Sequence, residues 1–111
     1  MKDDKLYLIH VQECIQRIEK YTLGGKMEFM QQDLIQDAVI RNLQVLAESS
    51  QRISDERKLN HPEVDWLALS GFRNILVHDY LGVDLEMVWN IIDNDLPSLK
   101  YSLLKMLDEN N

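Results

Sequence analysis

The chain has 111 residues, 45% of them hydrophobic, with a single cysteine and a net charge of −7, which fits one domain over residues 1–111 and leaves no room for two. The charge excludes broad, sequence-independent binding of nucleic acid, because such binding depends on Lys and Arg displacing counterions, so any RNA contact must be a local patch. One cysteine excludes an internal disulfide, and no apolar run reaches the roughly 20 residues needed to cross a bilayer, so we expect a cytoplasmic protein with no membrane segment.

Hydrophobic periodicity predicts helices along the chain, because apolar residues recur every three or four positions and no alternating strand pattern occurs. The first helix is expected over about residues 3–22, where Gly24 and Gly25 then stop it. A long second helix is expected over about residues 26–56, fraying or turning in the polar stretch that begins at Glu48.

The second half of the chain contains two prolines that suit first helical turns, since the N–H that proline lacks would have no partner there. Pro62 is expected to open a third helix, and Pro97 a fifth. Asp84 is expected to cap a fourth helix over about residues 85–94. The predicted fold is all-α, an up-and-down bundle of about four to five antiparallel helices with short connections.

Arg73 and His78 lie in the segment Gly71-Phe-Arg-Asn-Ile-Leu-Val-His-Asp-Tyr80 and have side chains suited to phosphate chemistry. Arg73 offers a permanent charge and a planar set of donors that match a phosphate, and His78 can both take and give a proton. Five positions apart, they point about 140° apart on a regular helix, whereas Asn74 and His78 share a face. Either Arg73 swings toward that face or the helix loosens near His78, in which case the hydroxyl of Tyr80 reaches the same cavity.

An Arg–His pair suits RNA cleavage without a metal. The 2′-hydroxyl attacks the adjacent phosphorus, His78 moves a proton, and Arg73 stabilises charge on the phosphoryl oxygens, giving a 2′,3′-cyclic phosphate and a 5′-hydroxyl end. One histidine serves one proton transfer at a time, so a second copy of the chain would supply the missing acid or base, which favours a homodimer. The sequence has neither a His/Cys/Asp cluster with metal spacing nor a glycine-rich phosphate loop, so we predict no metal and no cofactor.

Simpler interpretations stand beside these. On spacing alone, Arg73 and His78 are more easily explained as a helix-surface pair, and Tyr80 as a packing residue with its hydroxyl satisfied. Asp37 and Arg41, one turn apart on the second predicted helix, either make an ion pair worth about 0.2–0.5 kcal/mol or line the cleft as supporting residues.

The chain resembles the HEPN superfamily, and specifically its HepT-like toxins. The resemblance is carried by Phe72-Arg-Asn-Ile-Leu-Val-His-Asp-Tyr80, Val83-Asp84, Val88-Trp89, Asp95-Leu-Pro97 and, less specifically, by the segment from Asp37 to Glu48. Members of that family are helical bundles that cleave RNA without a metal and dimerise so that two Arg-x4-His motifs meet at a cleft. The resemblance therefore implies that Arg73 and His78 are catalytic and that Asn74 is a supporting, orienting neighbour.

The same resemblance implies partners. HepT-like toxins are paired with a minimal nucleotidyltransferase antitoxin that attaches AMP to the tyrosine of Arg-x4-His-x-Tyr, which is Tyr80 here. An adenylylated tyrosine would put bulk and negative charge beside Arg73 and block RNA. The expected assembly is a homodimer, or a higher oligomer with the antitoxin. Two alternatives stay open: a non-catalytic HEPN module that binds a nucleotidyltransferase and helps to present its substrate, and a plain helical scaffold.

Overall fold

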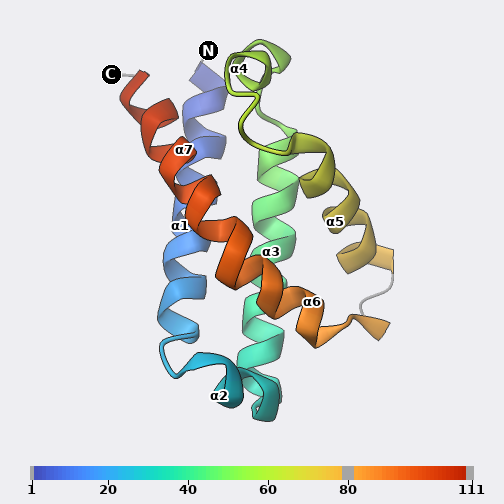
Figure 1. Cartoon of the computed structure of the whole chain (residues 1–111). Coiled ribbons are helices and arrows are strands. Elements are labelled where there is room, and N and C mark those ends of the chain that lie inside the picture. The colour runs from blue at the N-terminus through green and yellow to red at the C-terminus, as the bar shows by residue number, and fades with distance from the viewer. Residues whose placement is uncertain (1, 79–81, 110–111) are drawn as a thin grey trace.

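The computed structural model describes residues 2–78 and 82–109, which are helical over most of their length and include no strand (Figure 1). The elements follow in the order α1 (Lys2–Tyr21), α2 (Gly25–Gln31), α3 (Asp33–Gln51), α4 (Asp55–Asn60), α5 (Trp66–His78), α6 (Leu85–Asn90), a π-helical turn η2 (Ile91–Asp95) and α7 (Leu96–Glu109). The predicted all-α class is confirmed. No helix of the described residues combines the length and the apolar character needed to span a bilayer.

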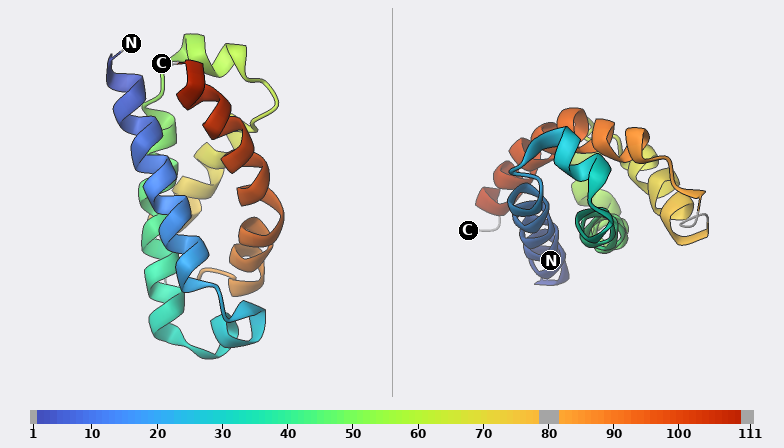
Figure 2. Two further views of the ribbon diagram at one scale, coloured as in Figure 1. Left: turned by 90° about the vertical axis from the view of Figure 1, so that its left-hand side faces the viewer. Right: turned by 90° about the horizontal axis from the view of Figure 1, so that it is seen from below.

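The long helices run alternately down and up, as expected for an up-and-down bundle: α1 down, α3 up, α5 down and α7 up in Figure 1. α3 is central and contacts both α1 and α5, while α7 packs on α1. Figure 2 shows α1, α3 and α5 side by side, with the segment from α6 through η2 to α7 arching over one face of them. The opposite face of this three-helix layer is left uncovered by the other described helices.

The core lies between that layer and α7. It is formed by apolar side chains of every long helix, among them Leu8, Ile15, Ile18, Leu43, Leu46, Phe72, Leu76, Leu99, Leu103 and Met106. Cys14 is buried in the same cluster, and burial raises the pKa of its thiol. The predicted helical stripes therefore face inward, which is the burial that drives helices of this length to pack.

The single helix expected over residues 26–56 is wrong, because the chain is broken within it. Gln32 is extended (φ −114°, ψ 102°) and separates α2 from α3. The amide of Gln36 donates to the carbonyl of Phe29 at 2.9 Å, which satisfies an acceptor near the end of α2. The break accompanies the burial of the Phe29 ring, whose centroid lies 5.5 Å from that of Trp89.

The end of α3 is also fixed by contacts distant in sequence. α3 stops at Gln51, and Ser54 caps the short α4 by accepting from the N–H of Arg57. The buried carboxylate of Asp4 on α1 accepts from the N–H of Ser54 at 2.9 Å and from its hydroxyl at 2.7 Å. These bonds tie the turn to α1, so the chain turns there instead of continuing the helix.

The expected helix start at Pro62 is wrong. Pro62 lies in the turn after α4, and α5 begins at Trp66. The carboxylate of Asp65 accepts from the N–H of Ala68 at 2.9 Å and so supplies the cap that the sequence interpretation gave to proline. The indole N–H of Trp66 donates to the carbonyl of His61 at 3.1 Å and fixes the angle at which the chain enters α5.

The predicted cap at Asp84 is confirmed, since its carboxylate accepts from the N–H of Glu86 at 2.9 Å. The helix expected to open at Pro97 is found, since α7 begins at Leu96 and Pro97 lies in its first turn, but no break separates it from α6. α6 continues into α7 through η2, where the N–H of Leu96 donates to the carbonyl of Ile91. Proline cannot donate to the carbonyl four residues earlier and its ring crowds that carbonyl, so a wider π turn accommodates Pro97 without ending the helix.

Candidate active site

α5 is attached to α3 by three polar side-chain contacts, which we call the α3–α5 polar ladder. From one end to the other, Gln44 Nε2 donates to Leu76 O at 2.9 Å, Arg73 Nη2 lies 3.5 Å from Glu48 Oε1, and Gln51 Nε2 donates to Ser70 Oγ at 3.0 Å. The contacts recur once per helical turn on both helices, as expected for antiparallel neighbours whose facing residues are three or four apart.

Arg73 is held in the middle of this ladder. Its side chain is 30% exposed, with Nη2 on Glu48 and Nη1 donating to Asn74 Oδ1 at 3.1 Å. Its Nε is buried and has no hydrogen-bond partner among the described residues. Leaving a buried donor unpaired costs about 1–3 kcal/mol, so an acceptor for this N–H would stabilise the arrangement. Asn74 is exposed and contacts Arg73, the contact an orienting neighbour would make.

His78 is exposed and is the last residue of α5. α5 stays helical up to His78, and the Arg73 side chain is directed to Glu48. No hydrogen bond or ion pair joins Arg73 and His78 in the described part of the chain. Tyr80, the predicted site of AMP attachment, lies outside the described residues.

Gln44 was missed by sequence reasoning. The carbonyl of Leu76 belongs to the last turn of α5, where carbonyls have no partner within the helix, and the Gln44 amide satisfies it. The bond therefore fixes the backbone two residues before His78. The available signal was the polar stripe of Arg41, Gln44 and Glu48 along one side of α3, which ordinary surface exposure explains equally well.

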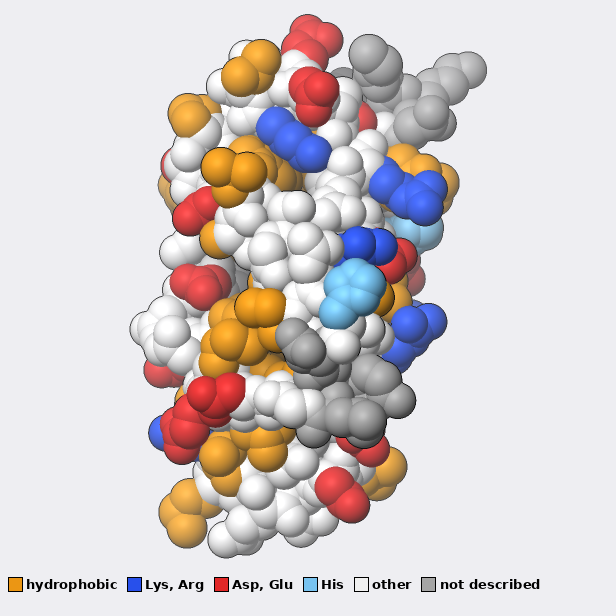
Figure 3. Space-filling model, turned by 90° about the vertical axis from the view of Figure 1, so that its right-hand side faces the viewer, with side chains coloured by type: hydrophobic (Ala, Val, Ile, Leu, Met, Phe, Trp, Pro, Cys, Tyr) orange, Lys and Arg blue, Asp and Glu red, His pale blue; other side chains and the backbone are white. Residues whose placement is uncertain are grey.

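An open groove of about 580 Å³ lies beside the ladder, between residues of α1, α3 and α5. We call it the α3 groove; it is lined by Tyr7 and His10 of α1, by Arg41, Gln44, Val45, Glu48, Ser49 and Arg52 of α3, and by Val77 of α5. Figure 3 shows Lys, Arg and His side chains gathered along one edge of the adjoining side of the molecule, although the chain as a whole is acidic.

The structure separates the two supporting residues predicted on α3. Arg41 is exposed and lines the α3 groove. Asp37 is also exposed but is not among the lining residues, and no ion pair joins it to Arg41. The groove thus contains the predicted arginine, together with Arg52, which the sequence interpretation did not single out.

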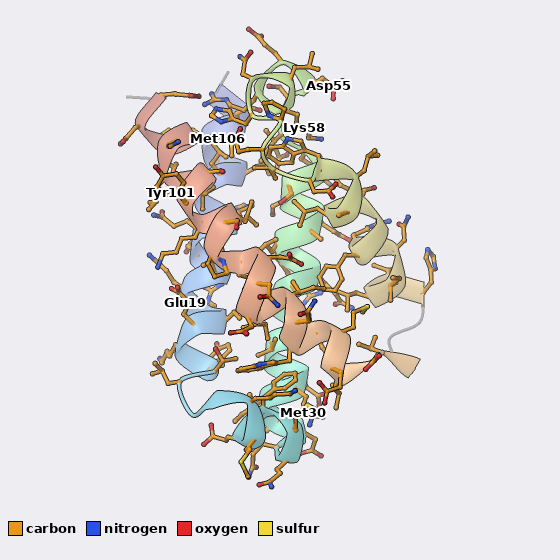
Figure 4. The ribbon with its side chains drawn as sticks, in the orientation of Figure 1. Glu19, Met30, Asp55, Lys58, Tyr101 and Met106 are labelled. Carbon is orange, nitrogen blue, oxygen red and sulfur yellow. The ribbon has the colours of Figure 1, made fainter. Side chains whose placement is uncertain are left out.

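A second cluster of ionisable groups lies at the end of the bundle where α4 meets the last turns of α7, near Lys58 and Met106 in Figure 4. His61 is buried there, with Nδ1 3.1 Å from Glu63 and Nε2 2.9 Å from Glu109. Burial lowers the pKa of the imidazole, but hydrogen bonds and charge from the two carboxylates outweigh burial and raise it. His61 is also the residue that ends α4.

The neighbouring Asp4 and Arg57 complete this cluster. Arg57 Nη1 donates to the carbonyl of Met106 at 3.0 Å, and Arg57 Nε lies 3.5 Å from Asp4. Burial opposes ionisation of Asp4, yet its bonds from Ser54 and the charge of Arg57 hold the pKa of that carboxyl below its usual value. These contacts join α1, α4 and α7, so we assign the cluster to stability. Among the described residues, no group of three or more His, Cys, Asp and Glu could hold a metal ion.

Comparison with known proteins points to one family. The family model described as "Ribonuclease HepT-like" matches residues 11–106. A protein of Thermococcus cleftensis named "Probable ribonuclease HepT" is 36% identical over 106 residues, which is 95% of this chain and 96% of the relative. A Methanocaldococcus jannaschii protein named "Putative RNase" is 33% identical over 100 residues, covering 89% of this chain and 92% of the relative.

A longer protein of Methanocaldococcus jannaschii, named "Gamma-glutamylcyclotransferase and putative RNase", is 35% identical over 109 residues. The match covers 97% of this chain but 49% of that relative, so the chain spans about half its length. No solved structure shows a significant match. The family model covers most of the chain, and the Thermococcus relative is matched nearly from end to end: the chain belongs to the HepT-like ribonuclease family.

Proposed function

We propose that this protein is a metal-independent endoribonuclease that acts as the toxin of a toxin–antitoxin pair, with residues 1–111 as one HEPN-like domain. The observation that carries the proposal is the placement of Arg73 in a chain of the HepT-like ribonuclease family. Its guanidinium contacts Glu48, which lines the α3 groove, and its Nε has no partner among the described residues. His78 is exposed at the end of the same helix.

The proposed reaction is a transesterification within RNA. A base removes the proton of the 2′-hydroxyl, the 2′-oxygen forms a bond to the adjacent phosphorus, and the bond from phosphorus to the 5′-oxygen breaks as that oxygen takes up a proton. Arg73 binds the phosphoryl oxygens, which carry more charge in the transition state than in the substrate. The products are a 2′,3′-cyclic phosphate and a 5′-hydroxyl end.

A homodimer supports this chemistry better than a single chain does. The reaction needs both a base and an acid, each chain offers one motif histidine, and Arg73 of the described structure pairs with Glu48. Two motifs brought together would let the His78 of one copy act as base and that of the other as acid, with the two arginines on one phosphate. Asn74 and Arg41 are proposed as supporting residues, as is Asp37, although it does not line the groove.

Neutralisation is proposed to occur through Tyr80. A minimal nucleotidyltransferase antitoxin would transfer AMP from ATP to the tyrosine oxygen and release pyrophosphate. The added phosphate would compete with RNA for the Arg73 guanidinium. Intact-mass measurement after incubation with ATP and a candidate nucleotidyltransferase antitoxin should show AMP-sized increments that Tyr80→Phe abolishes. An unchanged mass with growth still rescued would mean inhibition by binding.

Cleavage is tested with the purified chain and a fluorescent RNA in excess chelator. The wild type should yield fragments with cyclic phosphate ends, and His78→Ala should reduce the rate by at least about 100-fold, the usual contribution of a general acid or base. Expression of the wild type alone should slow bacterial growth, whereas His78→Ala should not. Gln16→Ala, an exposed change on α1, is the matched control. Equal growth and no fragments with either protein would overturn the proposal.

The net charge of −7 favours one alternative, a non-catalytic HEPN module that binds a nucleotidyltransferase and helps to present its substrate. An acidic surface suits a protein partner better than a polyanion. This alternative predicts a stable complex with the nucleotidyltransferase that survives Arg73→Ala, and no RNA fragments from the purified chain.

A further inference from the structure

The α3 groove is lined by cationic and aromatic side chains that are separate from the Arg73–His78 pair. Arg41, Glu48 and Arg52 lie on one face of α3, separated by seven and then four residues, or about 10 Å and 6 Å along the helix axis at about 1.5 Å per residue. Arg73 of α5 is not among the lining residues, but its guanidinium contacts Glu48, which lies between the two arginines along α3. Two permanent positive charges therefore line one side of the groove, and a third lies next to it.

The opposite wall of the groove is aromatic. The rings of Tyr7 and His10 on α1 are 6.3 Å apart, edge to face, and the Arg52 guanidinium lies 6.0 Å from the centre of the Tyr7 ring. Tyr7 and His10 are both partly exposed, so one surface of this pair is open to a ligand. An aromatic wall beside a row of cations is the combination that binds single-stranded nucleic acid, since bases stack on rings and phosphates pair with cations.

The charges that line the groove also favour single-stranded nucleic acid as its ligand. In a chain of net charge −7, the acid lining the groove is Glu48, and it is already engaged by Arg73. A duplex would need many phosphate contacts over a broad basic surface, which this acidic chain does not offer. A short single strand needs a few phosphate contacts and unstacked bases, both of which fit a narrow groove.

We propose that the α3 groove is the binding track for single-stranded RNA. Arg41 and Arg52 hold phosphates on either side of the phosphate bound by Arg73, and Tyr7 stacks against a base. This inference rests on the proposed ribonuclease function for the identity of the ligand. It adds binding residues on α1 and α3 to a reaction whose chemistry takes place at the end of α5.

The binding test uses the full chain carrying His78→Ala and a fluorescently labelled single-stranded RNA, with anisotropy measured over a range of salt concentrations. Arg41→Gln and Arg52→Gln should each weaken binding about fivefold or more and reduce the slope of log affinity against log salt by about one. Tyr7→Leu should weaken binding and leave the slope unchanged, because stacking releases no counterion. Arg17→Gln removes an exposed arginine of α1 that does not line the groove, and it should change neither quantity.

Cleavage measured with His78 intact separates this inference from the proposed function. Arg52→Gln should raise KM about fivefold and leave kcat unchanged, since it acts on binding alone. If the wild type binds RNA through these residues but cuts none, the ribonuclease proposal fails and the track stands. If the wild type cuts RNA while Arg41→Gln and Arg52→Gln behave like Arg17→Gln, the track is overturned.

A second copy of the chain is the competing occupant of the groove. In that case Arg52→Gln would weaken self-association in sedimentation experiments and leave RNA affinity unchanged, which would also overturn the track. Circular dichroism and thermal unfolding should match the wild type for each variant, because the altered side chains are exposed or only partly buried.

Discussion

Arg73 and Glu48 join α5 to α3 through an ion pair in which Nη2 and Oε1 are 3.5 Å apart and the glutamate is 48% exposed. At this distance and exposure the pair contributes little to stability, in the range of about 0–1 kcal/mol. A phosphate carries comparable charge and can accept from two nitrogens of the guanidinium at once, so it competes well with Glu48. Glu48 therefore holds Arg73 in place while the groove is empty and opposes any anion that enters.

Replacing Glu48 should expose this competition. Glu48→Gln removes the negative charge from the groove and keeps the shape, so RNA affinity should rise several-fold while the free energy of unfolding changes by less than about 1 kcal/mol. Anisotropy with labelled RNA in the His78→Ala background measures the first, and urea unfolding the second. Glu86→Gln, which breaks the exposed pair with Lys26, is the control. Unchanged or weaker RNA binding by Glu48→Gln would contradict this role.

Gln44 should act as a positioning residue. Gln44→Met keeps the length of the side chain but cannot donate to Leu76 O, so the last turn of α5 loses a fixed carbonyl just before His78. We expect kcat to fall while KM stays within about twofold, together with a loss of about 1 kcal/mol in stability. Steady-state cleavage kinetics with the RNA substrate check the split between kcat and KM.

The control for this experiment is Gln51→Met, which removes the contact at the opposite end of the ladder. Its cleavage kinetics should resemble those of the wild type, because Ser70 lies two turns from His78. Equal losses of kcat in the two variants would show that the ladder acts only through stability.

The His61 cluster predicts a stability that depends on pH. The pKa of His61 is raised in the folded protein above its ordinary value of 6.5, so the protonated ring stabilises the fold. That contribution is fully present below pH 6.5 and is lost as the pH rises through the higher folded-state pKa. Urea unfolding at a series of pH values should show it, and His61→Gln should flatten the curve in that range. A free energy of unfolding that increased across this pH range in the wild type and not in the variant would contradict this prediction.

Cys14 should be inert in the folded protein. Burial raises the pKa of its thiol, so little thiolate is present near neutral pH, and the side chain is almost fully covered. A thiol reagent should label it at the rate of unfolding in native buffer and at once in denaturant. Fast stoichiometric labelling without unfolding would contradict the burial of this residue.

Periodicity predicted the helical class, the inward stripes and the cap at Asp84, because these depend on residues close together in sequence. It failed at Gln32 and at Pro62, where the outcome depends on side chains that bond the backbone. The start of α5 shows the reason: Asp65 caps it and Trp66 bonds back to His61, and neither bond follows from hydrophobic pattern.

The residues of the candidate site likewise fall into those that the sequence predicted and those that it did not. Spacing and family resemblance pointed to Arg73 and His78, which lie on one helix. Glu48, Gln44 and Arg52 lie on another helix, and their relation to the motif is set by the register of α3 against α5. That register cannot be read directly from a single sequence, because it depends on the packing of the whole core.

The polar ladder also fixes the position of α5 along the axis of α3. If α5 slid along α3 by one turn, about 5.4 Å, all three contacts would lose their partners together. Smaller displacements would stretch every contact at once, so no intermediate position satisfies part of the ladder. The ladder therefore fixes the position of His78 along the axis of α3. An insertion or deletion within α5 between Ser70 and Leu76 would misplace the histidine even with Arg73 and His78 both intact.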